Sequence, residues 1–192
     1  MILLVIDIQK GITDNTLYNF ENFINKTKTL IAEARANNIE IIYVQHDDGP
    51  GTGFSVGDEE FEIAEQVAPK KSDKVFVKTI CSCFGNKELA EYLQQQEDKR
   101  LMIVGLQTNF CIDATIKSAF EKGFKVIVPE GTNSTFDNDY MDAETTYRYY
   151  NEMMWPERFA QCVSAEEAIS MMKQEQGEKH EQRSEKSRNA RF

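Results

Sequence analysis

The sequence predicts a single three-layer α/β/α domain with a parallel sheet at its centre, and three observations lead to this fold class. Short runs that are apolar on both faces recur along the chain, and amphipathic helical patterns lie between them, so strand and helix alternate about six times. The length of 192 residues fits one domain. A content of 41% hydrophobic and 28% charged residues is typical of a folded domain rather than a disordered chain.

The predicted strands are short, predominantly apolar runs. Such runs suit strands that helices cover on both sides, as in a parallel sheet. In chain order the six expected strands are Ile2 to Ile6, Ile39 to Val44, Val75 to Val77, Leu101 to Val104, Lys125 to Val128 and Phe159 to Val163.

The predicted helices carry apolar residues at spacings of three and four, which gather on one helix face. Two helices also have end signals. Gly123 suits the position just after a helix end, and Ser164 with Glu167 is typical of a capping box at a helix start. The expected helices are Leu17 to Asn37, Lys87 to Glu97, Cys111 to Lys122, Asp139 to Met154 and Ala165 to Lys173.

The composition changes at Gly177, after which apolar residues almost disappear. The last 16 residues contain five basic and three acidic residues. We therefore expect a folded domain over residues 1–176 and a polar C-terminal tail over residues 177–192.

The charge balance excludes several classes of partner. Lys and Arg number 22 against 32 Asp and Glu, a formal charge of −10, whereas nucleic-acid binding requires a basic face. No apolar run approaches the roughly 18 residues of a membrane span. The apolar start of the chain lacks the basic region and cleavage site of a signal peptide. We therefore expect a cytoplasmic protein without nucleic-acid or membrane partners.

The cysteines and histidines do not form the pattern of a disulfide scaffold or a structural zinc site. The four cysteines include no C-x-x-C pair, and the only histidines are His46 and His180. We expect no metal and no other cofactor.

Polar residues of several chemical types follow the apolar runs. Asp7 follows the first run, His46 the second, Lys78 the third, and Cys111 comes shortly after the fourth. Taken singly, Asp7 suits a turn, Lys78 a solvated surface and Cys111 a small buried position. Ligands of an open parallel sheet, however, bind at the carboxyl ends of the strands. The joint placement therefore predicts a site where a carboxylate, an ammonium and a thiol meet.

This set of groups suits nucleophilic catalysis by a thiolate. Cys111 is expected to open a helix, whose dipole and unpaired amides favour a thiolate, and Lys78 is expected to lower its pKa further. Asp7 would accept the thiol proton and return it to a leaving amine.

Five stretches of the sequence resemble a known family. They are LLVIDIQKG (3–11), IIYVQHDDGPGTG (41–53), VFVKTICSCFGN (75–86), GLQTNFCIDAT (105–115) and FKVIVPEGTNSTFDN (124–138). In these stretches the chain resembles the isochorismatase-like cysteine hydrolase superfamily, which also contains nicotinamidases, carbamoyl-amide hydrolases and small-molecule amidases. The resemblance covers roughly residues 1 to 170.

The resemblance implies a catalytic triad of Asp7, Lys78 and Cys111 on a Rossmann-like six-stranded sheet of order 3-2-1-4-5-6. It also implies a cis peptide bond between Leu106 and Gln107. The backbone amides of Gln107 and Cys111 would then form the oxyanion hole that stabilises the charge of an acyl-transfer intermediate. The expected substrate-pocket residues are Gln9, His46, Phe84 and Tyr140, and an equal alternative for His46 is that it only holds its loop.

Departures from the family pattern reduce the number of reactions and ligands that we expect for this chain. Members that bind a metal carry Asp-Trp-His after the second strand, whereas residues 45–48 here are Gln-His-Asp-Asp, which disfavours a metal and nicotinamidase activity. Residues 49–53 lack the Gly-Lys-Ser/Thr ending of a phosphate-binding loop, so we interpret them as an active-site loop. True isochorismatases usually lack the cysteine, so Cys111 favours an amide substrate. Cys81 and Cys83 are expected to pack beneath the site.

The leading hypothesis is a cysteine-dependent hydrolase that cleaves a small amide, ureido or carbamoyl compound through a thioester. One alternative is hydrolysis of an ether of the isochorismate type, with Asp7 as the acid. Another is a non-catalytic domain that binds small molecules or senses redox state through a sulfenic acid on Cys111. The expected partners are a small-molecule substrate and further copies of the chain, as a homodimer or homotetramer.

Overall fold

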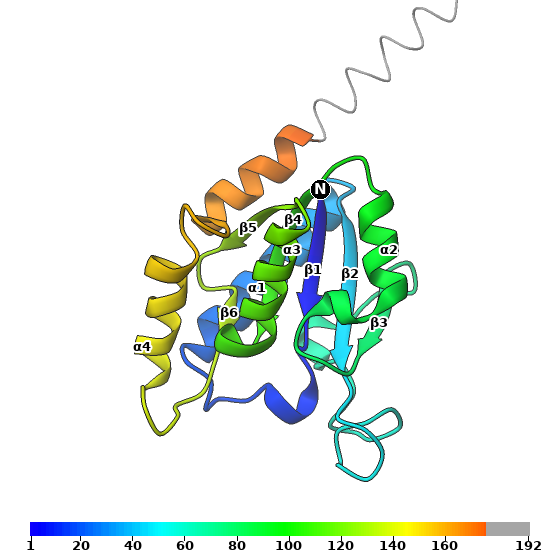
Figure 1. Cartoon of the computed structure of the whole chain (residues 1–192), viewed down its shortest axis with the longest axis vertical. Coiled ribbons are helices and arrows are strands. Elements are labelled where there is room, and N and C mark those ends of the chain that lie inside the picture. Colours follow the sequence, from blue (N-terminus) through cyan, green and yellow to red (C-terminus); the bar gives the residue numbers. More distant parts are fainter. Residues whose placement is uncertain (176–192) are drawn as a thin grey trace, which may run out of the picture.

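The computed structural model describes residues 1–175 and shows one parallel sheet with helices on both faces (Figure 1). Within this range the sheet has seven strands in the order β3-β2-β1-β4-β5-β7, while β6 lies off this path and pairs with β4. The strands are β1 (Ile2–Ile6), β2 (Glu40–His46), β3 (Lys74–Lys78), β4 (Arg100–Leu106), β5 (Lys125–Pro129), β6 (Asn133–Ser134) and β7 (Gln161–Val163). The predicted three-layer α/β/α fold is confirmed.

The predicted strand order is confirmed, but the predicted number of strands is one too low. The missed strand is β6, which contains only the polar residues Asn133 and Ser134 and therefore has no apolar run. It pairs with Gly105 and Leu106, so it extends the sheet beside the carboxyl end of β4. The sixth strand of the prediction is β7 in the structure.

The helices lie close to where the apolar spacing predicts them. They are α1 (Phe20–Ala36), α2 (Lys87–Gln95), α3 (Asp113–Glu121), α4 (Ala143–Arg148) and a further helix over residues 165–175. Short 3₁₀ turns occur at Lys10–Ile12, Glu65–Val67 and Cys83–Gly85, and π-helical turns at Thr108–Ile112 and Tyr149–Met154.

Side-chain caps determine where several helices begin and end. The predicted capping box is confirmed, because the backbone amides of Ser164 and Glu167 each donate to the other residue's side chain. Gly123 follows the end of α3 with φ +83°. The helix predicted from Asp139 begins only at Ala143, because the side chain of Asp142 caps it and accepts from the backbone amide of Thr145.

The core is divided by the sheet into two layers, and β1 contributes to both. Leu3 and Val5 pack with α1 and the helix over residues 165–175. Leu4 and Ile6 pack with α2 and α3 on the other face. Burial of each of these side chains contributes about 1.5–3 kcal/mol, so burial on both faces explains why the strand is apolar at every position.

The carboxyl ends of β1 to β4 meet at one edge of the sheet, which is the lower edge in Figure 1, where the loop after β2 hangs below the strands. Gly105 in β4 allows the two central strands to approach closely there. Its φ is +132°, and an added Cβ would lie 1.9 Å from the carbonyl oxygen of Ile6.

Two predictions about the chain as a whole have different outcomes. In the described part of the chain, every helix is too short or too polar to cross a membrane. The polar tail predicted over residues 177–192 lies outside the described residues.

Candidate active site

Lys78 is the centre of the predicted site. Its Nζ lies 2.8 Å from Oδ2 of Asp7, and the two side chains are 0% and 2% exposed. The same ammonium donates a hydrogen bond of 3.3 Å to Sγ of Cys111. The structure therefore brings the predicted carboxylate, ammonium and thiol together at the carboxyl edge of the sheet.

Asp7 and Lys78 are each placed by the end of a strand. Asp7 follows β1 directly, and its backbone amide donates to the carbonyl of Val44 in β2. Its φ of +53° is uncommon for a residue other than glycine. Lys78 is the last residue of β3, and Asn86 donates to the adjacent carbonyl of Val77.

The prediction that Cys111 opens a helix is slightly displaced, because Cys111 lies within the first helical turn and not at its first residue. The helical turn begins three residues earlier, at Thr108. The carbonyl of Gln107 accepts from the amides of Phe110 and Ile112, and the second of these bonds gives the turn its π-helical width. The peptide bond between Leu106 and Gln107 is cis, as predicted. The oxyanion hole at Gln107 and Cys111 stays a prediction.

Burial and the ion pair set the charges of Asp7 and Lys78. Burial raises the pKa of Asp7, and the ammonium of Lys78 opposes it. Burial lowers the pKa of Lys78, but the charges of Asp7 and Cys111 outweigh it and leave the pKa above its ordinary value. Lys78 is therefore an ammonium at neutral pH, and Asp7 is a stronger base than an exposed carboxylate.

The prediction that the pKa of Cys111 is lowered is wrong. Burial and the negative charge of Asp7 raise the pKa of this thiol, and the contact with Lys78 only partly opposes them. The resting thiol is therefore protonated, and a base must remove its proton as it attacks. A carboxylate oxygen of Asp7 lies within 4.8 Å of Sγ, which suits Asp7 for that task.

His46 lies against Lys78. Its Nδ1 is 2.8 Å from the ammonium, and its Nε2 is 3.0 Å from Oδ1 of Asp48. Asp7, His46 and Cys111 each offer a possible metal-ligating atom, and these atoms lie within 4.8 Å of one another. The ammonium of Lys78 contacts all three side chains and already supplies a positive charge among them.

Gln9, a predicted pocket residue, is completely buried and bound to the backbone. Its Nε2 donates to the carbonyls of His46 (3.0 Å) and Phe61 (2.8 Å), and its Oε1 accepts from the amide of His46 (2.7 Å). The geometry makes Gln9 a brace beneath His46, because none of its surface is left to face a ligand.

We expect Gln9→Leu to reduce the free energy of unfolding by about 3 kcal/mol, because buried backbone groups would lose their partner. Urea unfolding followed by circular dichroism measures this change. Gln66→Leu, at an exposed position, is the control and should cost less than about 0.5 kcal/mol. Equal effects of the two substitutions would contradict the bracing role.

The side chains of two other predicted pocket residues, Phe84 and Tyr140, have other surroundings. The ring of Phe84 packs 5.5 Å from that of Phe124, and the ammonium of Lys122 lies over it. Both neighbours follow the end of α3, at the opposite edge of the sheet from the cluster, so this placement does not fit a pocket wall. Tyr140 is 94% exposed in the loop before α4.

Cys83 is completely buried and packs beneath the site, as predicted, whereas the same prediction for Cys81 is wrong, because Cys81 is exposed. The backbone amide of Cys83 donates to Oγ1 of Thr115 in α3. Burial raises the pKa of the Cys83 thiol from 9.0 to about 12. The folded state therefore retains this proton at pH values where the unfolded chain has lost it.

The free energy of unfolding should consequently fall as the pH rises from 9 towards 12. We expect Cys83 to account for about 3 kcal/mol of the loss at pH 11. Urea unfolding at pH 8, 9, 10 and 11 measures the slope in the native chain and in Cys83→Ser, whose hydroxyl does not titrate there. The variant should show the shallower slope, and parallel slopes would refute the assignment.

Three polar residues that contact predicted site residues, or lie one contact away from them, were not predicted as site residues from the sequence. Asp48 belongs to the family-like stretch after β2 and contacts His46. Thr135 donates to Oδ1 of Asn109 at 2.6 Å and lies 3.5 Å from Oε1 of Gln107. Thr135 and Asn109 also lie in family-like stretches, which is the signal that could have identified them.

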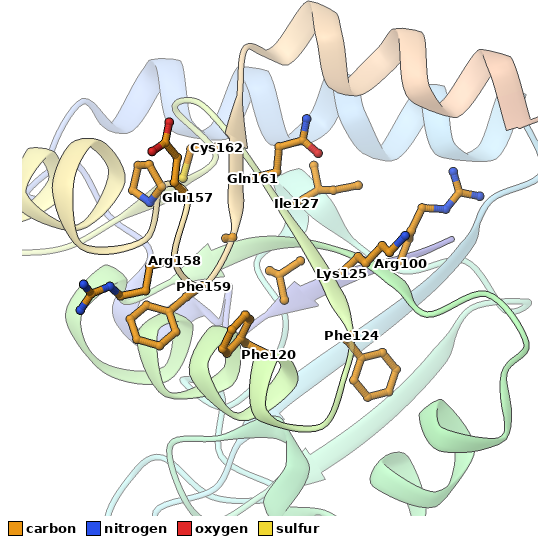
Figure 2. Close-up of a pocket in the computed structure, with 13 residues that line it drawn as sticks. Arg100, Phe120, Phe124, Lys125, Ile127, Glu157, Arg158, Phe159, Gln161 and Cys162 are labelled. Atoms are coloured by element: carbon orange, nitrogen blue, oxygen red, sulfur yellow. The ribbon is translucent and has the colours of Figure 1, made fainter.

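A separate hollow of about 580 Å³ lies between α3, β5 and β7 (Figure 2). Phe120 and Phe159 line it and meet edge to face, with ring centroids 5.5 Å apart. Arg100 and Lys125, the first residues of β4 and β5, also line it. The hollow therefore lies towards the amino ends of these strands, away from Cys111.

Comparisons with known proteins agree with this fold. A profile of the isochorismatase domain family matches residues 1–167. YddQ, an uncharacterized isochorismatase family protein of Bacillus subtilis strain 168, is 33% identical over 138 residues, which cover 69% of this chain and 77% of the relative. Nicotinamidase 3 of Arabidopsis thaliana is 24% identical over 155 residues, which cover 73% of this chain and 76% of the relative. A crystal structure of an isochorismatase family protein superposes with a TM-score of 0.77 at 32% identity and covers 84% of this chain and 96% of that one.

Proposed function

The chain belongs to the isochorismatase family of hydrolases, and we propose that it cleaves a small amide, ureido or carbamoyl compound through a thioester on Cys111. The observation that carries the proposal is the buried ammonium of Lys78, which contacts both the carboxylate of Asp7 at 2.8 Å and the sulfur of Cys111 at 3.3 Å. The similarity to a nicotinamidase, by its name an amide hydrolase, agrees with an amide-type bond.

In the first half of the reaction, the sulfur of Cys111 attacks the carbonyl carbon while Asp7 accepts the thiol proton. The raised pKa of Cys111 makes this transfer necessary, and the raised pKa of Asp7 makes its carboxylate a suitable acceptor. The C–N bond then breaks, and Asp7 gives the proton to the leaving ammonia or amine. The product bound to the enzyme is a thioester.

In the second half, Asp7 takes a proton from water as the water attacks the thioester. The C–S bond breaks, the acid is released and Cys111 regains its proton. Lys78 remains an ammonium throughout and holds the carboxylate and the sulfur at a fixed separation. The backbone amides of Gln107 and Cys111 are the donors that we assign to the oxyanion.

A panel of small amides, ureas and carbamates, assayed for release of ammonia or amine, tests the proposal. A slowly hydrolysed member of the panel should also leave its acyl group on the peptide that contains Cys111, as detected by mass spectrometry. If a panel member is cleaved without any adduct on that peptide under rapid quenching, the thioester mechanism is refuted, whereas ether hydrolysis predicts that no member of the panel is cleaved.

A further inference from the structure

Lys78 has a third polar neighbour that the proposed reaction does not use. Besides Asp7 and Cys111, the ammonium contacts Nδ1 of His46 at 2.8 Å. An ammonium carries three N–H donors, and the side chain of Lys78 is 0% exposed. Water therefore has no access to replace a lost partner, and each neighbour helps to fix the direction of the N–H groups.

The contact with Lys78 determines the tautomer of His46. Because the ammonium can only donate, Nδ1 must present its lone pair, and the neutral ring then carries its proton on Nε2. Nε2 lies 3.0 Å from Oδ1 of Asp48, which accepts that proton in a hydrogen bond. Asp48 therefore favours the tautomer in which His46 can accept from Lys78.

The sheet register places the ring against the ammonium. His46 and Lys78 are the last residues of β2 and β3 and are paired in register. The ladder continues one step further, since the amide of Asp47 donates to the carbonyl of Lys78 at 2.8 Å. On the other side, Gln9 binds both the amide and the carbonyl of His46. The backbone that carries the ring is therefore held from both sides.

We propose that His46, oriented by Asp48, is a positioning residue that aims an N–H group of Lys78 at the sulfur of Cys111. The inference deepens the proposed function and rests on it, because the group being positioned is the partner of the proposed nucleophile. The amide of Asp48 donates to the carbonyl of Phe54, so the loop after β2 is linked through these contacts to the thiol.

Two substitutions of His46 distinguish the effect of losing the hydrogen-bond acceptor from the effect of losing the imidazole ring. His46→Leu removes the acceptor and replaces the ring with an apolar side chain of similar bulk, whereas His46→Asn places an amide oxygen, also an acceptor, near the position of Nδ1. The measurement is the rate at which iodoacetamide alkylates Cys111, determined by mass spectrometry of its peptide. Cys81, which is exposed, is the internal reference. We expect His46→Leu to slow alkylation at least about tenfold and His46→Asn to stay within about threefold of the native rate.

Asp48 is tested against a matched residue of the same loop. Asp48→Ala removes the acceptor for Nε2 and should slow alkylation of Cys111 by about threefold. Glu59→Ala removes a carboxylate that is 83% exposed and pairs with Lys10, and it should leave the rate unchanged. With a substrate from the panel, His46→Leu should lower kcat and leave KM nearly unchanged, because His46 acts through Lys78 rather than on the substrate.

Unchanged or faster alkylation in His46→Leu overturns the inference, and so does a raised KM with unaltered kcat, which would make His46 a substrate-binding residue. If the native chain cleaves nothing in the panel while the alkylation pattern holds, the proposed function fails and the positioning role stands. If His46→Leu does not fold, the rate of Cys111 alkylation in Asp48→Ala tests the inference instead. This variant should fold, because the side chain of Asp48 is 53% exposed.

Discussion

Cys111→Ala is expected to lower kcat by at least about 10⁴-fold, because no other side chain of the cluster can form the acyl intermediate. The fold should persist, since the thiol is only partly buried and its loss costs little packing. Steady-state release of ammonia or amine, together with circular dichroism and thermal unfolding, measures both effects.

Cys162→Ala is the matched control for this substitution. Cys162 is another partly buried thiol, and it lies in β7, beside the hollow of Figure 2 and outside the cluster. Its replacement should leave turnover unchanged. Substantial activity in Cys111→Ala would refute nucleophilic catalysis, and if Asp7→Ala were then inactive, ether hydrolysis with Asp7 as the acid would be selected.

Gly105→Ala is expected to reduce the free energy of unfolding by more than about 3 kcal/mol, or to prevent folding. The added Cβ would lie 1.9 Å from the carbonyl oxygen of Ile6, and a φ of +132° is strained for any L side chain. Both strands belong to the centre of the sheet, so neither can move aside without separating Asp7 from Cys111. Urea unfolding, or the soluble yield if no transition is seen, measures the effect.

Gly123→Ala isolates the cost of positive φ from the cost of the clash. Gly123 has φ +83° and nothing within 4 Å of an added Cβ, so its replacement should cost only about 1 kcal/mol. If both alanine substitutions cost the same, close approach of β4 to β1 is not what requires glycine at position 105.

Most of the fold was predictable because burial on both sides of a parallel sheet leaves a clear apolar signal. β1 and β4 have that signal at nearly every position. β6 has none, since Asn133 and Ser134 join the sheet through backbone pairing with β4 and not through an apolar run. The start of a helix was predictable where the capping residues are neighbours in sequence, as at Ser164. It was less predictable near Cys111, where the amides of Phe110 and Ile112 share the carbonyl of Gln107 and widen the turn.

The meeting of Asp7, Lys78 and Cys111 was predictable because topology alone brings strand ends to one edge. The charge state of the thiol was not predictable, because it depends on burial and on the distance to Asp7. The directions in which side chains point from their loops could not be predicted from the sequence either. Phe84 points towards Phe124 and Gln9 turns into the backbone, although both follow strands that end at the site.

Lys78, which contacts the other residues of the cluster, is the last residue of β3, a strand at one edge of the sheet. Among the described residues β3 pairs with β2 alone, and Val75 within it is 43% exposed. Edge strands open locally at a smaller free-energy cost than the whole domain does. Local opening of β3 would move the ammonium of Lys78 away from Asp7 and Cys111 while the central sheet stays intact. Mild denaturant should therefore abolish activity at a lower concentration than it unfolds the domain. The amide hydrogens of β3 should exchange over the same range of denaturant in which activity is lost.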